Sequence, residues 1–226
     1  VERPGDEPDR GRTPPERAAG DEVPRHAWER DPGNPRLMPS FDVAPGAPPA
    51  RAVSAPSVAY DAADQTWKMW FAVHWKEGEG VRAGVKYAES SDGIRWTVAD
   101  PLAFAPATDA DAWDHTEVDS PCVLIQPDAP ADRRYLLYYA GANRRDRGSG
   151  PSLPRIGVAF SASGRRFTRL PAEESPQGAA GLLLAPQDVV PAGAGALSDP
   201  EVVCTEGGFH LWYTVFRGAS GEAGER

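Results

Sequence analysis

The chain has 226 residues, of which 23 are glycine and 24 are proline, and this composition favours many turns and short strands over long helices. Its net charge is −9, its pI is about 5.0, and no stripe of lysine and arginine offsets the acidity, which argues against nucleic acid as a partner. No apolar run approaches the roughly eighteen residues of a membrane span, so the sequence predicts neither a transmembrane segment nor a membrane partner.

The first segment, residues 1–25, is rich in proline, arginine, glutamate, aspartate and glycine and has hardly any apolar content. A segment of this kind cannot bury enough apolar surface to fold, so we predict a disordered tail. The chain starts at Val1, as expected of a processed protein or a fragment, and shows no apolar signal-peptide region. We expect a soluble protein, cytoplasmic or secreted, with one folded domain over residues 26–226.

Three segments of this domain repeat one pattern, in which a proline, any residue and a valine open a short apolar strand. The prolines are Pro56, Pro121 and Pro200, which are 65 and 79 residues apart (121−56 and 200−121). Each pattern is followed, after a polar turn, by an aromatic run that is typical of a strand. These runs are residues 67–72, 135–140 and 209–214. Both faces of each run are apolar, which predicts strands buried between packed sheets.

A third element follows in the first two copies, where residues 85–97 align without gaps on residues 156–168. Gly93 and Gly164 stand at the same place in a serine-rich turn, so each copy predicts a strand, a tight turn and a second strand. Four strands in each repeat are typical of a propeller blade. The predicted fold is all-β, a β-propeller of four-stranded antiparallel blades with no helix longer than two turns.

The stretch before the first blade fits the same frame. Trp28 followed by residues 34–37 resembles Trp96 followed by residues 100–102, which end the first blade. We therefore predict that residues 28–37 supply the outer strand of the last blade, and pair with a blade other than that of Pro56, because propellers close their ring in this way. The chain then holds about two and a half blades plus a closing strand, an incomplete propeller truncated at its C-terminus.

These residues resemble the five-bladed propeller glycosidases, which include the arabinanase and β-xylosidase group and the invertase and levanase group. The resemblance covers residues 26–216. It rests on Asn34–Pro35, the three proline strands, the aromatic strand at residues 69–71, and the Ala-x-Ser-x-Asp-Gly-x-x-Trp hairpin at residues 88–96. It implies a glycoside hydrolase, or a related phosphorylase, that acts on an oligosaccharide or polysaccharide and needs no cofactor.

In the resembling families the catalytic carboxyl groups lie where the innermost strands begin, around a central channel. Here the third blade has Asp199 and Glu201 beside its proline, and the second blade has Asp119 one residue earlier. We predict that these three converge on one end of the channel, with Glu201 as general acid, Asp199 as base or orienting carboxylate and Asp119 as modulator or hydroxyl ligand. The alternatives are turn capping for the two aspartates and a buried salt bridge for Glu201.

Aromatic and acidic residues in neighbouring segments predict sugar contacts at the rim of the same pocket, since rings stack on sugars and acids bind hydroxyls. The predicted substrate-binding residues are Asp42, His74, Trp75, Trp113, Asp114, His115 and Glu117. For the segment 113–119 a solvated acidic loop is the alternative. Its spacing does not match a metal site, so no metal is predicted.

Two other functions remain open. The first blade has Ser54 and Ala55 where a carboxylate is expected, which favours a non-catalytic carbohydrate-binding propeller. A structural or protein-binding propeller is the other alternative, against which the acidic aromatic loop argues.

The two cysteines, Cys122 and Cys204, each lie in an apolar run. We expect two buried free thiols and no disulfide.

Overall fold

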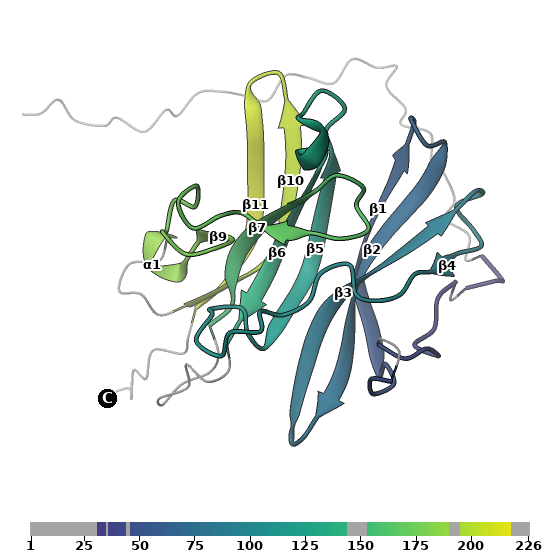
Figure 1. Cartoon of the computed structure of the whole chain (residues 1–226), viewed down its shortest axis with the longest axis horizontal. Helices are drawn as coiled ribbons and strands as arrows, with labels where there is room; N and C mark the ends of the chain where they lie inside the picture. Colours follow the sequence, from purple (N-terminus) through teal and green to yellow (C-terminus); the bar gives the residue numbers. More distant parts are fainter. Residues whose placement is uncertain (1–30, 35, 44–45, 144–152, 190–194, 218–226) are drawn as a thin grey trace, which may run out of the picture. The chain divides into compact units, whose positions relative to one another are not determined.

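The computed structural model describes residues 31–34, 36–43, 46–143, 153–189 and 195–217, whose regular structure is almost all β-strand (Figure 1). All the strands belong to one compact unit, residues 35–226. The helices of the described part are the 3-10 helix η1 (Ala131–Arg133) and the four-residue α1 (Pro186–Val189), which confirms that long helices are missing there. None of the described helices could span a membrane. The predicted tail, residues 1–25, lies outside the described residues.

The first blade is a four-stranded antiparallel sheet in sequence order. Its strands are β1 (Ala52–Asp61), β2 (Thr66–Glu77), β3 (Gly80–Ser90) and β4 (Thr97–Val98). The aromatic strand β2 is buried on both faces from Met69 to Val73, as predicted. Gly93 adopts a φ of 72° in the turn before β4, and Asp92 accepts the N–H groups of Arg95 and Ile94. These backbone hydrogen bonds lower the pKa of Asp92 to about 2.

The second blade repeats the first. Its strands are β5 (Glu117–Ile125), β6 (Tyr135–Ala142), β7 (Arg155–Ser161) and β8 (Thr168–Arg169), and β9 (Leu182–Leu184) adds to β7. Ala88 of β3 opposes Val98, and Ala159 of β7 opposes Arg169, so the gapless repeat gives the same register in both blades. The fold is therefore a propeller-type arrangement of four-stranded blades, as predicted.

The third blade is represented by the hairpin of β10 (Gly195–Thr205) and β11 (Gly208–Arg217), drawn in yellow in Figure 1. It forms a separate two-stranded sheet, and the ring of blades is not closed within the described residues. One face packs on the second blade through Val202 and Leu211. The aromatic residues Phe209 and Trp212 are exposed, so the prediction of burial on both faces is wrong for β11, because no described element covers the other face.

One backbone feature recurs at the start of all three inner strands, β1, β5 and β10. Ala55, Ser120 and Asp199, each directly before a proline, have positive φ values of 46°, 48° and 51°. At each place the inner strand carries one residue more than its partner, which is a β-bulge. A non-glycine residue in this region costs of order 1 kcal/mol or more, so the same strain is held three times.

The inner strands also meet through a repeated hydrogen bond. The N–H of Val123 donates to Ser57 Oγ at 3.0 Å, and the N–H of Val202 donates to Cys122 Sγ at 3.3 Å. In both cases the accepting side chain, Ser57 or Cys122, belongs to the residue directly after a blade's proline. The donating N–H, of Val123 or Val202, belongs to the second residue after the proline of the next blade. The first and second blades, and the second and third blades, therefore meet through the same local contact.

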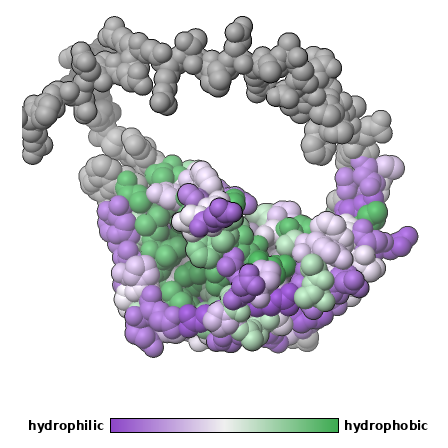
Figure 2. Space-filling view, turned by 90° about the horizontal axis from the view of Figure 1, so that it is seen from above, coloured by the Kyte–Doolittle hydropathy of each residue, from purple (hydrophilic) through white to green (hydrophobic). Residues whose placement is uncertain are grey.

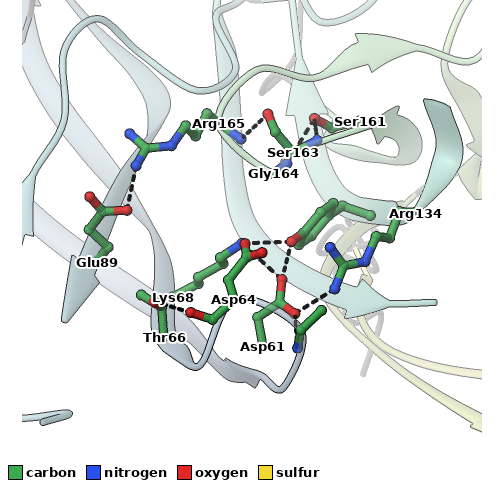
Figure 3. Close-up of polar contacts among 12 residues, drawn as sticks. Asp61, Asp64, Thr66, Lys68, Glu89, Arg134, Ser161, Ser163, Gly164 and Arg165 are labelled. Carbon is green, nitrogen blue, oxygen red and sulfur yellow. Dashed lines mark hydrogen bonds and ion pairs between the residues drawn. The ribbon is translucent and has the colours of Figure 1, made fainter. Parts of the chain in front are cut away.

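A buried polar cluster joins the far end of the first blade to the second (Figure 3). Lys68 Nζ lies 2.8 Å from Asp61 Oδ2 and 2.6 Å from the hydroxyl of Tyr135, which stands in the second blade. Arg134 and Tyr135 also donate to Asp61. Burial alone would raise the pKa of Asp61, but the hydrogen bonds from Lys68 and Tyr135 lower it below its ordinary value.

The segment expected to close the ring is described only in part, because Trp28 lies outside the described residues. Leu37 packs against Met69 and Phe71 of the first blade. This is a side-chain contact and not backbone pairing, so the expectation that the segment pairs with a blade other than that of Pro56 stays a prediction. The side chain is held there by the apolar face that β2 presents.

The two cysteines are free, which confirms the prediction that they form no disulfide. Cys122 is buried as expected, whereas Cys204 is exposed. The prediction of burial is wrong for Cys204 because it stands near the end of β10, opposite the exposed Phe209.

Candidate functional site

The three proline bulges surround a hollow of about 160 Å³. Its lining residues are Ala55, Pro56, Ser120, Pro121, Asp199, Pro200 and Glu201. A second hollow of about 200 Å³ lies beside it and is lined by Glu117, Asp119, Ser120, Ala140, Gly141, Ala142, Pro154 and Ser198. Ser120 lines both hollows, so the two form adjoining parts of one candidate site at the start of the inner strands.

Two of the predicted catalytic carboxylates meet at Ser120. The Ser120 hydroxyl donates to Asp199 Oδ1 at 3.0 Å, and the Ser120 backbone N–H donates to Asp119 Oδ1 at 2.5 Å. Ser198 also donates to Asp199 Oδ1, at 3.2 Å. Carboxylates from successive blades are thus fixed on either side of one residue, and neutral donors orient both.

His74 stands beside the same pair. Its Nε2 atom lies 2.9 Å from Ser54 Oγ and 3.5 Å from Asp119 Oδ2. Ser54 and Asp119 occupy equivalent positions, two residues before the prolines of the first and second blades, so His74 bridges the blades. The side chains of His74 and Asp119 are 26% and 29% exposed, which leaves both accessible to a ligand.

Glu201 lines the first hollow together with Asp199 but is exposed. It follows Pro200 by one residue, the position that Ser57 and Cys122 occupy in the other blades. Burial raises the pKa of the Cys122 thiol, and the negative charge of nearby Glu201 adds to the effect. Glu201 is therefore at the inner strand as predicted, on the side where inner strands contact one another.

Two further predicted residues lie where the chain enters β5. Glu117 begins this strand and lines the second hollow. His115 lies outside the linings of both hollows, and its Nδ1 atom is 2.8 Å from the carbonyl oxygen of Ala107. This contact ties the loop together, so His115 has a local partner within the loop itself.

Trp113 and Asp114 lie in a different place. The Trp113 ring stacks on Tyr139, with centroids 5.6 Å apart, and its indole N–H donates to the carbonyl of Ala180. Asp114 is fully buried and accepts hydrogen bonds from the Tyr139 hydroxyl and Arg169. Burial and the charge of Asp114 hold the pKa of Tyr139 well above its usual range. Trp113 and Asp114 line a separate cavity of about 510 Å³ rather than the two hollows.

The last two predicted binding residues also lie outside the linings of the two hollows. Asp42 is exposed and pairs with Pro49 in an isolated β-bridge. Trp75 is buried with Val43 and Val73 in a small apolar cluster. A tryptophan at the end of a strand can pack in a core or stack on a sugar, and Trp75 packs in the core.

Sequence reasoning did not single out Ser120, which links the two carboxylates. The available signal was the alignment of the three prolines, since the residue before each one lines the shared hollow. Among the residues that the structure describes, no group of three or more histidine, cysteine, aspartate or glutamate side chains is placed to hold a metal ion.

Comparison with solved structures finds glycoside hydrolases of the propeller type. One, from work on the GH130 family of mannoside phosphorylases, which contains glycoside hydrolases that target β-1,2 mannosidic linkages in Candida mannan, is 19% identical with a TM-score of 0.52. It matches 87% of this chain and 55% of its own. A glycosyl hydrolase from Bacteroides ovatus is 15% identical with a TM-score of 0.51, matching 84% and 56%.

A third structure, described as a glycoside hydrolase, is 14% identical with a TM-score of 0.51 and is matched over 74% of this chain and 50% of its own. The chain thus spans about half the length of the solved structures it matches. At these identities the likeness establishes the propeller fold alone. No protein-family model matches the sequence, and no curated protein matches it.

Proposed function

We propose that the chain forms the catalytic side of a propeller that hydrolyses glycosidic bonds in an oligosaccharide or polysaccharide. The observation that carries this proposal is the meeting of Asp119 and Asp199 at Ser120, in hollows lined by all three inner strands. The likeness to propeller glycoside hydrolases supports it.

Glycoside hydrolysis usually needs two carboxyl groups, one to protonate the leaving oxygen and one to act as a base or nucleophile. Asp199, oriented by the hydroxyls of Ser120 and Ser198, is our candidate for the second role. Asp119 is our candidate for the first role, because its side chain is 29% exposed at the second hollow, with Oδ2 3.5 Å from His74 Nε2.

Glu201 was predicted from the sequence as the general acid. Its position matches those of Ser57 and Cys122, whose side chains bind the backbone of the next inner strand. We therefore assign the proton-donor role to Asp119 rather than to Glu201.

The test is hydrolysis of a panel of nitrophenyl glycosides that includes β-mannosides, with and without inorganic phosphate to detect a phosphorylase. Asp119→Asn and Asp199→Asn should each lower kcat/KM by roughly a hundredfold or more, the usual weight of a general acid or base. Asp64→Asn removes a carboxylate outside both hollows and serves as the control. Activity that survives both substitutions would overturn the assignment.

A second candidate is a carbohydrate-binding propeller without catalysis. It is favoured by the first blade, where Ala55 lines the hollow at the place that Asp199 occupies in the third. In that case calorimetry should detect polysaccharide binding that Asp199→Asn weakens, while no panel member is cleaved.

A further inference from the structure

The cavity of about 510 Å³ that Trp113 and Asp114 line is separate from the two hollows of the candidate site. Its volume falls in the range of roughly 300–1,000 Å³ in which small-molecule pockets are found. Part of its lining comes from the segment 107–114, which leads from the first blade to the second. The rest comes from Arg155 of β7, Arg169 of β8 and the segment 179–182, so every lining residue precedes the third blade.

Hydrogen bonds fix the segments that surround this cavity. The indole N–H of Trp113 donates to the Ala180 carbonyl at 3.0 Å, and Arg169 Nη2 donates to the Ala105 carbonyl at 2.9 Å. The Trp113 ring is held in place by its stacking on Tyr139. The lining is therefore preorganised, which lowers the entropic cost of binding a ligand there.

One lining residue, Asp114, carries a buried acceptor that lacks a donor. The Tyr139 hydroxyl at 2.9 Å and Arg169 Nε at 2.8 Å both donate to its Oδ2 atom. Its Oδ1 atom is buried and accepts no hydrogen bond from any described residue. An unsatisfied buried acceptor is unfavourable, so a ligand that brings a donor to Oδ1 gains from it. The side chain is 1% exposed, so only a group as small as a hydroxyl could approach.

The rest of the lining combines both signs of charge with apolar surface. Asp109 and Asp111 are exposed, whereas Arg155 and Arg169 are half-buried. With Asp114, three carboxylates and two guanidinium groups line one cavity, so an anion meets the former and a cation meets the latter. The apolar lining residues, besides Trp113, are Ala107, Ala112, Ala179, Ala180 and Leu182.

This mixed lining favours an uncharged ligand that has hydroxyl groups and an apolar face. Figure 2 shows a surface of another kind, where hydrophobic residues gather in a patch in the left half of the view. A sugar ring meets the requirements of the cavity, because its hydroxyls both donate and accept hydrogen bonds and its C–H groups are apolar.

We propose that this cavity is a second carbohydrate site, which binds an uncharged sugar residue. One sugar hydroxyl donates to Asp114 Oδ1, the guanidinium groups of Arg155 and Arg169 donate to others, and the ring lies on the alanines and Leu182. The site goes beyond the proposed function, because sugar binding here does not require that the two hollows catalyse.

The test is an NMR titration of the 226-residue chain with D-mannose, D-glucose and D-galactose. The indole ¹⁵N–¹H signal of Trp113 reports on the cavity, and Trp113→Phe identifies it among the seven tryptophans. At least one neutral sugar should shift this signal in a saturable manner. D-glucuronate and D-glucosamine, which carry opposite charges, should each bind roughly tenfold or more weakly, because each meets like charges in the lining.

Two substitutions probe the cavity itself. Ala180→Leu adds volume at an exposed lining residue, leaves Asp114 intact and should weaken sugar binding roughly tenfold or more. Ala62→Leu, in the exposed turn after β1, is the matched control and should bind like wild type. Asp114→Asn should also weaken binding roughly tenfold, because Tyr139 and Arg169 hold the oxygen at Oδ2 and leave an NH₂ group in place of the acceptor.

Urea unfolding establishes that each variant is folded, and Ala180→Leu decides the matter if Asp114→Asn is not. Asp119→Asn and Asp199→Asn, in the two hollows, should leave the Trp113 titration unchanged, which separates this site from the proposed catalysis. The proposal is overturned if no neutral sugar shifts the Trp113 signal. It is also overturned if Ala180→Leu titrates like Ala62→Leu, or if the charged sugars bind as tightly as the neutral ones.

Discussion

Replacing Asp61 by asparagine perturbs the buried polar cluster that joins the first two blades (Figure 3). The Asp61 side chain is 1% exposed and accepts hydrogen bonds from Lys68, Arg134 and Tyr135. The variant keeps the shape of the side chain but leaves part of the positive charge of Lys68 without its buried partner. The contact links β1 to β6, so its loss weakens the packing of the first blade on the second.

The expected cost follows from the burial of the pair. Breaking a buried ion pair by removing one partner costs about 3–5 kcal/mol, and about 3 kcal/mol is expected here because Asp64 still contacts Lys68. Asp64→Asn is the matched control, since its side chain is 51% exposed and bonds to the same Lys68 Nζ. An exposed partner of this kind contributes about 1 kcal/mol or less.

Urea unfolding at neutral and acidic pH measures both effects. The folded pKa of Asp61 lies below its ordinary value of 3.8, so its stabilisation is complete above that pH and is lost as pH falls through the depressed folded pKa. The difference between wild type and Asp61→Asn should therefore shrink in acid. Equal costs for Asp61→Asn and Asp64→Asn at neutral pH would refute the reasoning.

Two further predictions concern the blade hairpins and the thiols. Gly93→Ala should cost about 1 kcal/mol in urea unfolding, because φ is positive but the nearest atoms lie at ordinary distances. Gly164→Ala should cost more, since its Cβ would stand 2.8 Å from the Trp70 ring; equal costs would contradict this packing. Thiol labelling of the folded chain should modify the exposed Cys204 quickly and the buried Cys122, whose pKa is raised, only on unfolding; fast labelling of both would contradict the β10–β5 packing.

The blade could be predicted from the sequence because its determinants are local. The turn at Gly93 and its counterpart at Gly164 need positive φ, and the apolar runs beside them fix two strands in one register. The exposure of Trp212 could not be predicted in this way. Burial of an aromatic strand on both faces depends on a neighbouring sheet, which the strand's own residues do not specify.

The proposed site combines residues that the sequence singles out with one that it does not. Carboxylates beside the prolines could be read from the repeat, whereas the bridge through Ser120 depends on how two blades approach each other. Trp113 and Asp114 look like a sugar subsite in sequence, because an aromatic ring beside an acid is the usual chemistry of one. Their partners, Tyr139 and Arg169, are 26 and 55 residues away (139−113 and 169−114), so the burial that removes them from the hollows has no local signal.

The carboxylate of Asp199 is not needed for the backbone conformation in which it stands. Aspartate tolerates positive φ better than most residues, so turn formation before a proline was a sufficient reason for it in the sequence. The structure separates the two reasons, because Ala55 and Ser120 adopt the same φ at the equivalent positions without a carboxylate. The bulge therefore does not require a carboxylate, and we look for the reason for aspartate in the third blade in its surroundings. Those surroundings are the hydroxyls of Ser120 and Ser198 and the shared hollow, which is where a ligand would meet it.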